Sequence, residues 1–183
     1  MPDKDTRQVL LCGLGGQGVV LAGSLLGAAG FADGLQVSGT ASYGAAARGG
    51  ECRSEIVLSH SSVAFPFVTK ADILVALSQS AYDRYITWTA TPDGEVYYDP
   101  ASVQPKPDAP QRHVAIPALK RTEELLGSQT GANITVLAAV VEATGIVSAD
   151  SLITVVKTRS PGRFLDQNLK ALELGRALAH EIQ

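Results

Sequence analysis

Short apolar runs separated by longer helical patterns fill the first half of the chain. The runs within Gln8–Cys12 and Ala71–Leu77 are nearly continuous, which is typical of strands buried on both faces of a sheet. The stretch from Gly16 to about Ala32 is longer and rich in small residues, and it predicts a helix covered on most sides by other parts of the protein. Gln36–Thr40 and Cys52–Ser59 are the other strands expected in this half.

In the second half, short strands and a proline-rich loop precede a C-terminal third that is predicted to be helical. A short helix is expected from Ser78 to Tyr85, and Ser148 is expected to cap a later helix. The other predicted elements are strands at Glu95–Asp99 and His113–Pro117 with a proline-rich loop over Pro100–Gln111 between them, a polar helix to about Leu126, and helices at Asn133–Thr144, Asp150–Thr158 and Phe164–Ile182. Strands alternating with helices predict an α/β fold, a three-layer α/β/α sandwich with a mainly parallel, Rossmann-like sheet.

A glycine-rich turn, Gly13-Leu-Gly-Gly-Gln-Gly18, joins the first strand to the first helix. The free N–H groups and the positive dipole end of such a helix suit a phosphate or a carboxylate. Gly13, Gly15 and Gly18 match the spacing of dinucleotide-binding turns. However, the second strand ends without the acid that binds ribose, and Asp33 precedes that strand. A nicotinamide or flavin site is therefore disfavoured but stays an alternative.

A second glycine-rich segment runs from Ser42 to Glu55 and enters a strand. It holds three glycines, two arginines and two glutamates. Gly49 and Gly50 allow close backbone approach, and the planar fork of Arg48 suits a carboxylate or a phosphate. The alternative is a surface loop whose arginine pairs with a neighbouring acid.

Composition excludes several classes of function. The 183 residues carry a net charge of −3 with scattered basic residues, so a nucleic-acid partner is not expected. Cys12 and Cys52 are the only cysteines, too few for a four-cysteine cluster. They are expected to be buried thiols in a reducing cytoplasm.

The sequence predicts neither a metal site nor a catalytic residue, because the three histidines have no metal-ligand spacing and no base is apparent for Ser42. The apolar stretch from Gly18 to Ala32 is too short to span a membrane, which takes about 20 apolar residues.

The two glycine segments carry a family resemblance. Gly13-x-Gly-Gly-Gln-Gly-Val-Val-Leu-Ala-Gly23 and Ser42-Tyr-Gly-x-x-x-Arg-Gly-Gly50 resemble the gamma subunit of 2-oxoacid:ferredoxin oxidoreductases. Asn133-Ile-x-x-Leu137-Ala and Asn168-x-x-Ala171-x-x-x-Gly175 agree with the same family, so residues 1–183 are interpreted as one gamma-subunit domain. The segment from Ala71 to Tyr85 is most similar to the 2-oxoglutarate type.

The resemblance implies a hetero-oligomeric enzyme that decarboxylates a 2-oxoacid, passes electrons to ferredoxin and forms acyl-coenzyme A. Thiamine diphosphate and iron–sulfur clusters would belong to partner subunits: alpha, beta and a small ferredoxin-like chain. This chain would be inactive alone. Its candidate coenzyme A contacts are Gly15, Gly16, Gln17, Gly18, Ser42, Tyr43, Arg48, Gly49 and Gly50. The alternatives are a structural adaptor in the same complex, the small subunit of indolepyruvate ferredoxin oxidoreductase, and a free-standing nucleotide-binding oxidoreductase.

Overall fold

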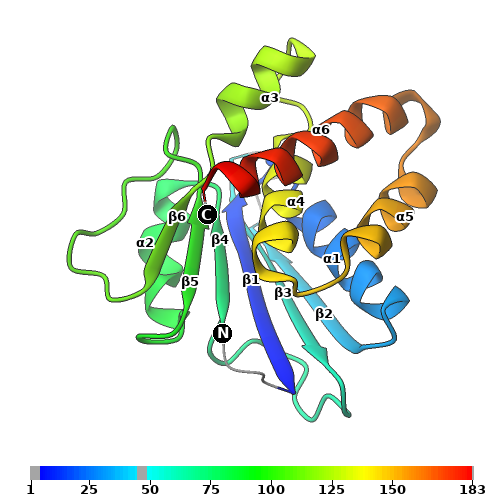
Figure 1. Ribbon diagram of the computed structural model, residues 1–183. Helices are drawn as coiled ribbons and strands as arrows, with labels where there is room; N and C mark the ends of the chain where they lie inside the picture. The colour runs from blue at the N-terminus through cyan, green and yellow to red at the C-terminus, as the bar shows by residue number, and fades with distance from the viewer. Residues whose placement is uncertain (1–4, 45–48, 183) are drawn as a thin grey trace.

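A six-stranded sheet forms the centre of the protein in a computed structural model that describes residues 5–44 and 49–182 (Figure 1). The strands are β1 (Thr6–Leu14), β2 (Gln36–Tyr43), β3 (Glu51–Ser59), β4 (Ile73–Ala76), β5 (Glu95–Tyr98) and β6 (Arg112–Ala115). Their order across the sheet is β2-β3-β1-β4-β5-β6. β3 runs antiparallel to both of its neighbours, and β1, β4, β5 and β6 pair in parallel. The mainly parallel sheet predicted from the sequence is therefore confirmed.

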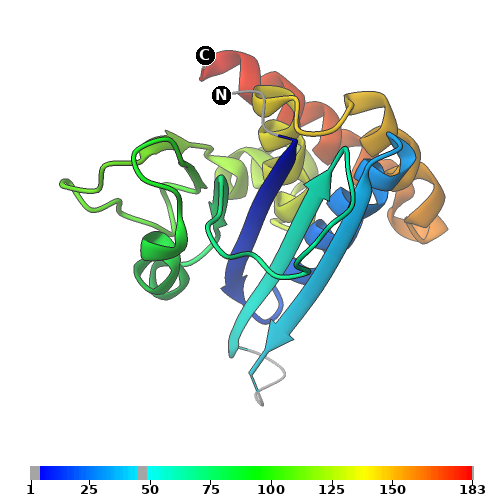
Figure 2. The ribbon, with the colours of Figure 1, turned by 90° about the horizontal axis from the view of Figure 1, so that it is seen from below.

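Helices cover both faces of the sheet (Figures 1 and 2). Four of them lie on one face: α1 (Val19–Ala32), α4 (Ala132–Thr144), α5 (Ala149–Arg159) and α6 (Gly162–Glu181). The other face carries α2 (Gln79–Tyr85) and a 3-10 turn, η1 (Ile86–Trp88), while α3 (Ala118–Leu126) extends away from the sheet. This arrangement confirms the α/β/α sandwich.

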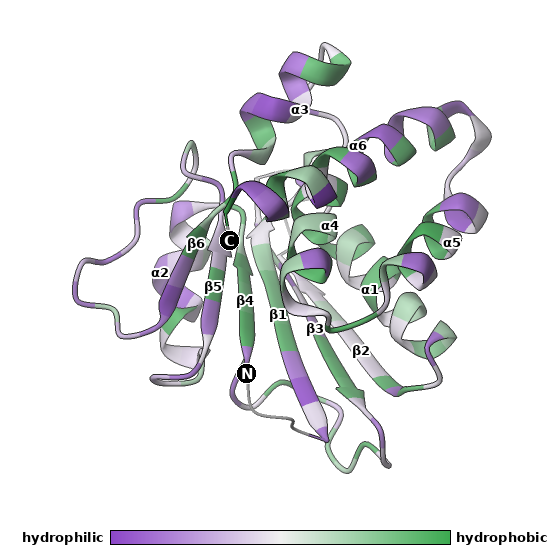
Figure 3. Ribbon diagram, viewed as in Figure 1, coloured by the Kyte–Doolittle hydropathy of each residue, from purple (hydrophilic) through white to green (hydrophobic). Residues whose placement is uncertain are grey.

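Alternation along the central strands divides the core into two parts. Val9 and Leu11 of β1 pack into the cluster that includes α1 and α4, whereas Leu10 and Cys12 pack into the cluster that includes α2. β4 is apolar along its whole length and appears green in Figure 3. The two-sided burial of this strand explains its continuous apolar run.

Two features differ from the elements predicted from the sequence. Helix α1 begins at Val19 and not at Gly16, because Gly16 and Gly18 have positive φ angles of 101° and 73° that a right-handed helix excludes. The antiparallel direction of β3 was not predicted, since a two-residue alternation is the same in either direction.

The end of α1 is tied to the start of α5 through Asp33. Its carboxylate accepts hydrogen bonds from Ser148 N at 2.6 Å, Ser148 Oγ at 2.7 Å and Ser151 Oγ at 2.5 Å. Ser148 in turn accepts from Ser151 N at 3.1 Å, which confirms it as the helix cap. Asp33 thus has a structural role and is not available to a ribose.

A pH-dependent loss of stability is expected from Asp33. Partial burial raises its pKa, but the hydrogen bonds from Ser151 and Ser148 together outweigh burial and lower the pKa below its usual range. A lowered native pKa gives stability that is present above the unfolded pKa of about 3.9 and is lost as pH falls through the native pKa. Urea unfolding should therefore show Asp33→Asn less stable than wild type at pH 7, with the difference shrinking below about pH 4. A difference that is constant with pH would contradict this.

Both cysteines are buried and unpaired. Burial, assisted by the nearby charge of Glu51, raises the pKa of the Cys12 thiol, and burial also raises that of Cys52. The sequence prediction that both thiols are buried is confirmed. Within the described ranges, none of the helices has both the length and the apolarity needed to cross a membrane.

Candidate functional site

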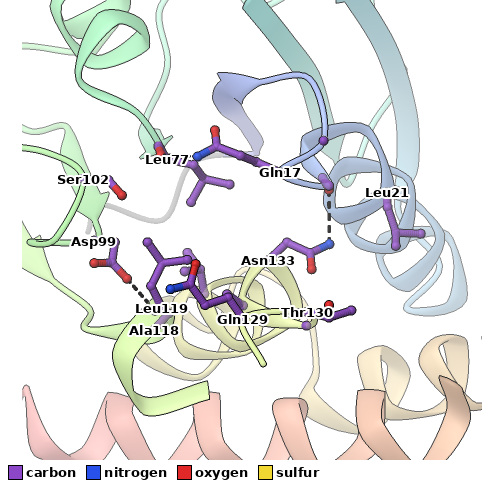
Figure 4. Close-up of a pocket in the computed structure, with 15 residues that line it drawn as sticks. Gln17, Leu21, Leu77, Asp99, Ser102, Ala118, Leu119, Gln129, Thr130 and Asn133 are labelled. Atoms are coloured by element: carbon purple, nitrogen blue, oxygen red, sulfur yellow. Dashed lines mark hydrogen bonds between the residues drawn. The ribbon is translucent and has the colours of Figure 1, made fainter. Parts of the chain in front are cut away.

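A pocket of about 610 Å³ lies at the end of the sheet where β1 and β4 terminate and α1 and α4 begin (Figure 4). Ligands of open α/β sheets bind at this end, outside the carboxyl ends of the strands. The glycine turn before α1, the residue after β4 and the segment before α4 all contribute to its wall. The lining residues are Gly16, Gln17, Gly18, Leu21, Leu77, Asp99, Ser102, Ala118, Leu119, Gln129, Thr130, Gly131, Ala132, Asn133 and Val136.

Gln17 bridges the ends of the two central strands. Its Oε1 accepts a hydrogen bond from Leu14 N at 2.6 Å, and its Nε2 donates to Leu77 O at 2.8 Å. The junction of β1 and β4 is the point where a doubly wound sheet usually admits a dinucleotide. Because the Gln17 side chain occupies that junction, the structure disfavours the nicotinamide alternative for a second reason besides the missing ribose-binding acid.

Asn133 joins the beginnings of α1 and α4. Its Nδ2 donates to Gly18 O at 3.2 Å, a contact drawn as a dashed line in Figure 4. Gly18 has a φ of 73°, and a Cβ on it would lie 2.4 Å from Asn133 Nδ2. Only glycine combines this backbone angle with this close approach. Two helix N-termini therefore converge on one pocket.

The electrostatic character of the pocket comes from backbone groups. The amides of Gly16 and Gly18 have no hydrogen-bond acceptor among the described residues, whereas the Val20 amide is directed at the Cys52 sulfur. Asp99 is the only charged lining residue in the described part of the chain. Both of its carboxylate oxygens are engaged, one by Ala101 N at 2.8 Å and one by Leu119 N at 2.7 Å. The two positive helix ends and the free amides suit an anionic group.

The two glycine segments lie side by side. Gly15 N donates to Gly50 O at 2.7 Å, and Gly49 N donates to Gly15 O at 3.3 Å. Ser42 and Tyr43 end β2, next to this contact, and pair in register with β3. None of these five residues lines the pocket. The candidate residues thus divide into a pocket group, Gly16–Gly18, and a group around the end of the β2–β3 pair, while Arg48 lies outside the described residues.

Glu51 and Arg53, at the end of the second glycine-rich segment, connect β3 to α2 and η1. Arg53 Nε donates to Glu55 at 2.9 Å, and the guanidinium lies 5.7 Å from the Tyr85 ring centroid and 5.2 Å from that of Trp88. A hydrogen bond from Arg53 to the Tyr85 hydroxyl raises the pKa of Arg53. Glu51 forms an ion pair with Arg84 of α2. These residues have a structural role.

Sequence reasoning missed part of the pocket. Asp99, Ser102, Gln129 and Thr130 line it but were not candidates. A polar residue directly after a parallel strand was the available signal for Asp99. Over the described ranges there is no group of three or more histidine, cysteine or acidic side chains that could hold a metal ion.

Comparison with known proteins identifies the family. Residues 8–178 match the model of the pyruvate ferredoxin/flavodoxin oxidoreductase family. The chain belongs to this family. It is 36% identical to the 2-oxoglutarate synthase subunit KorC of Methanothermobacter marburgensis, over 97% of this chain and 98% of KorC. KorC of Methanocaldococcus jannaschii is 37% identical, over 98% of this chain and 97% of that subunit.

Solved structures agree. The gamma subunit of a keto/oxoacid ferredoxin oxidoreductase from Geobacter sulfurreducens superposes with a TM-score of 0.83 at 31% identity, covering 96% of this chain and 99% of that one. The resemblance to gamma subunits is therefore confirmed. A longer relative, subunit VorA of the ketoisovalerate oxidoreductase of Methanothermobacter thermautotrophicus, is 32% identical over 98% of this chain but only 38% of VorA. The 2-oxoglutarate:ferredoxin oxidoreductase of Magnetococcus marinus shares the fold, with a TM-score of 0.87 at 23% identity over 99% of this chain and 32% of that one.

Proposed function

We propose that this chain is the gamma subunit of a cytoplasmic 2-oxoglutarate-type ferredoxin oxidoreductase. The near full-length similarity to two KorC subunits supports this assignment over the indolepyruvate alternative. The chain has only two cysteines, both buried, so the iron–sulfur clusters belong to partner chains. The thiamine diphosphate is likewise assigned to the alpha and beta partners, with a small ferredoxin-like subunit carrying electrons.

We further propose that the pocket at Gly16–Gly18 contacts coenzyme A. The single observation that carries this is the convergence of two helix N-termini on an open pocket through the Asn133–Gly18 hydrogen bond. Coenzyme A brings a pyrophosphate and a 3′-phosphate, which suit helix N-termini and free amides. The volume of about 610 Å³ lies in the usual range for ligand sites. The Magnetococcus enzyme was solved with coenzyme A and succinyl-CoA bound. Gly15, Ser42, Tyr43, Gly49 and Gly50 would then flank the bound ligand.

Thr130 offers a sharp test, because it is exposed at the pocket directly before the helix cap Gly131. In the assembled complex, Thr130→Glu should raise the KM for coenzyme A about tenfold, equal to ~1.4 kcal/mol, with kcat at saturating coenzyme A unchanged. The added negative charge opposes the phosphates and weakens the dipole at α4. The effect should diminish at high salt. Steady-state kinetics with varied coenzyme A measures it.

Thr130→Gln is the matched control, similar in size but neutral, and should leave the KM close to that of wild type. An unchanged KM in Thr130→Glu, with the complex intact, would remove coenzyme A from this pocket and leave the adaptor role. Failure of the purified wild-type subunits to form an active 2-oxoacid oxidoreductase would reject the assignment of the whole chain.

A further inference from the structure

Strand β2 forms an unprotected edge of the sheet. In the part of the chain that the structure describes, Gln36–Tyr43 pairs only with β3, and its other side carries unpaired N–H and C=O groups (Figure 2). Proteins usually protect such edges with lysine, proline, bulges or short strands. β2 has eight residues and contains neither a charged residue nor a proline. This edge has the features of a strand that is paired in the assembled protein.

Exposed aromatic residues flank β2 on both faces. Tyr43 shares the α1 side with Gly39 and Ala41 by alternation and is 74% exposed, and Phe31 at the end of α1 is 76% exposed. On the opposite side, a loop carrying Phe65 and Phe67 is held to β2 by a hydrogen bond from Ser38 Oγ to the Pro66 carbonyl at 3.0 Å. Phe31 and Tyr43, two large exposed side chains near this edge, indicate an interaction surface.

A groove of about 380 Å³ runs between α1 and β2. Small residues of α1 and β2, Gly23, Gly27, Gly39 and Ala41, line it together with Val20, Phe31 and Ile56. Arg159, at the end of α5, also lines it. Its guanidinium contacts Ser24 Oγ at 3.5 Å and has no carboxylate partner within residues 5–44 and 49–182.

We propose that this β2 edge binds an extended segment of the alpha partner, which adds a strand to the sheet and places a carboxylate at Arg159. The unpaired backbone groups can pair with an added strand, the groove has room for its apolar side chains, and the exposed guanidinium can pair with an acid. This inference rests on the proposed function as a subunit of a larger enzyme.

Charge favours a different chain over a second copy as the occupant. A second β2 strand has no acidic residue, and Asp33, the acid that precedes it, is already bound to Ser148 and Ser151. A β2-to-β2 dimer would therefore bring no acid of its own β2 strand to Arg159. The relatives point the same way, because VorA carries the equivalent of this chain as 38% of a longer polypeptide, whereas KorC matches over 98% of its own length. In VorA, the part equivalent to this chain is covalently joined to the rest of a longer polypeptide. We expect a separate gamma chain to make the corresponding contact non-covalently.

Hydrogen exchange on the free full-length chain and on the co-purified complex tests the pairing. The β2 amides that do not pair with β3 should exchange rapidly in the free chain and at least tenfold more slowly in the complex. The β3 amides, already paired on both sides, serve as the internal reference. Concentration-dependent protection of β2 in the free chain would show a second copy on this edge and overturn the proposal.

Two variant pairs test the chemistry of the surface. Phe31→Asp and Arg159→Glu should each weaken binding of the alpha partner about tenfold or more, measured by titration of the purified subunits. Leu125→Asp and Arg163→Glu are matched controls at exposed positions away from β2, and should leave the affinity within about twofold.

The outcomes separate this inference from the proposed function. An active complex in which β2 still exchanges as in the free chain overturns the added strand and leaves the gamma-subunit assignment in place. Equal effects of the β2-edge variants and their controls overturn the surface. Absence of any complex with wild-type subunits rejects the assignment itself.

Discussion

Gly18→Ala is expected to destabilise the protein by about 2–3 kcal/mol. A left-handed backbone costs a residue with a Cβ about 1–2 kcal/mol, and the φ of Gly18 is 73°. The new Cβ would also lie 2.4 Å from Asn133 Nδ2, so Asn133 must move and its hydrogen bond to Gly18 O is lost. That loss adds about 1 kcal/mol. Urea unfolding should show a lower midpoint with an unchanged m-value.

Gly34 provides the matched control. Its φ is 83°, but a Cβ there meets nothing within 4 Å, so Gly34→Ala carries the backbone strain without the clash. The difference between the two variants measures the contact between the glycine turn and α4. If both variants lose the same stability, Asn133 does not couple the two helices and the pocket wall is not held as the structure indicates.

The coupling of α1 to α4 also has a functional consequence. In the proposed coenzyme A site, the free amides at Gly16 and Gly18 can act together with the N-terminus of α4 only while the two helix ends stay together. Stability and coenzyme A affinity should therefore fall together in Gly18→Ala, whereas Thr130→Glu should change the affinity alone. These two patterns distinguish a residue that positions the pocket from one that faces the ligand.

Local signals in the sequence predicted most of the fold. The apolar run of β4, the alternation of β3 and the cap at Ser148 each depend on residues close together in the chain. Close helix packing also left a trace: a Cβ on Gly175 of α6 would lie 2.2 Å from Thr135 O of α4. The sequence showed this glycine, but the contact that requires it joins residues far apart in the chain.

The site was harder to predict because its contacts are long-range. Gly16, Gln17 and Gly18 were candidates, and the structure places them at the pocket. Asn133 reaches Gly18 from 115 residues away, and no local pattern reveals that meeting. Gln17 was grouped with the ligand contacts, yet both ends of its amide are used by backbone groups of β1 and of the residue after β4. Its proposed role is therefore to position the turn.

Gln17→Glu tests that role and should cost about 2–4 kcal/mol of stability at pH 7. The new carboxylate can still accept from Leu14 N, but its second oxygen would face Leu77 O, where Gln17 Nε2 now donates at 2.8 Å. One hydrogen bond becomes a repulsion between two acceptors in a half-buried site. Gln104→Glu, the same change at an exposed residue, should have little effect.

The pH dependence of Gln17→Glu distinguishes the bridge from simple packing. A protonated carboxyl can donate to Leu77 O, so folding favours protonation and the native pKa of the introduced group rises above its unfolded value of about 4.3. Stability close to that of wild type should therefore be present below that unfolded value and be lost as pH rises through the native pKa. Urea midpoints of Gln17→Glu and wild type across this range measure the recovery. A penalty independent of pH would mean that the Gln17 side chain fills space at the junction of β1 and β4 without holding the two strands together through its amide.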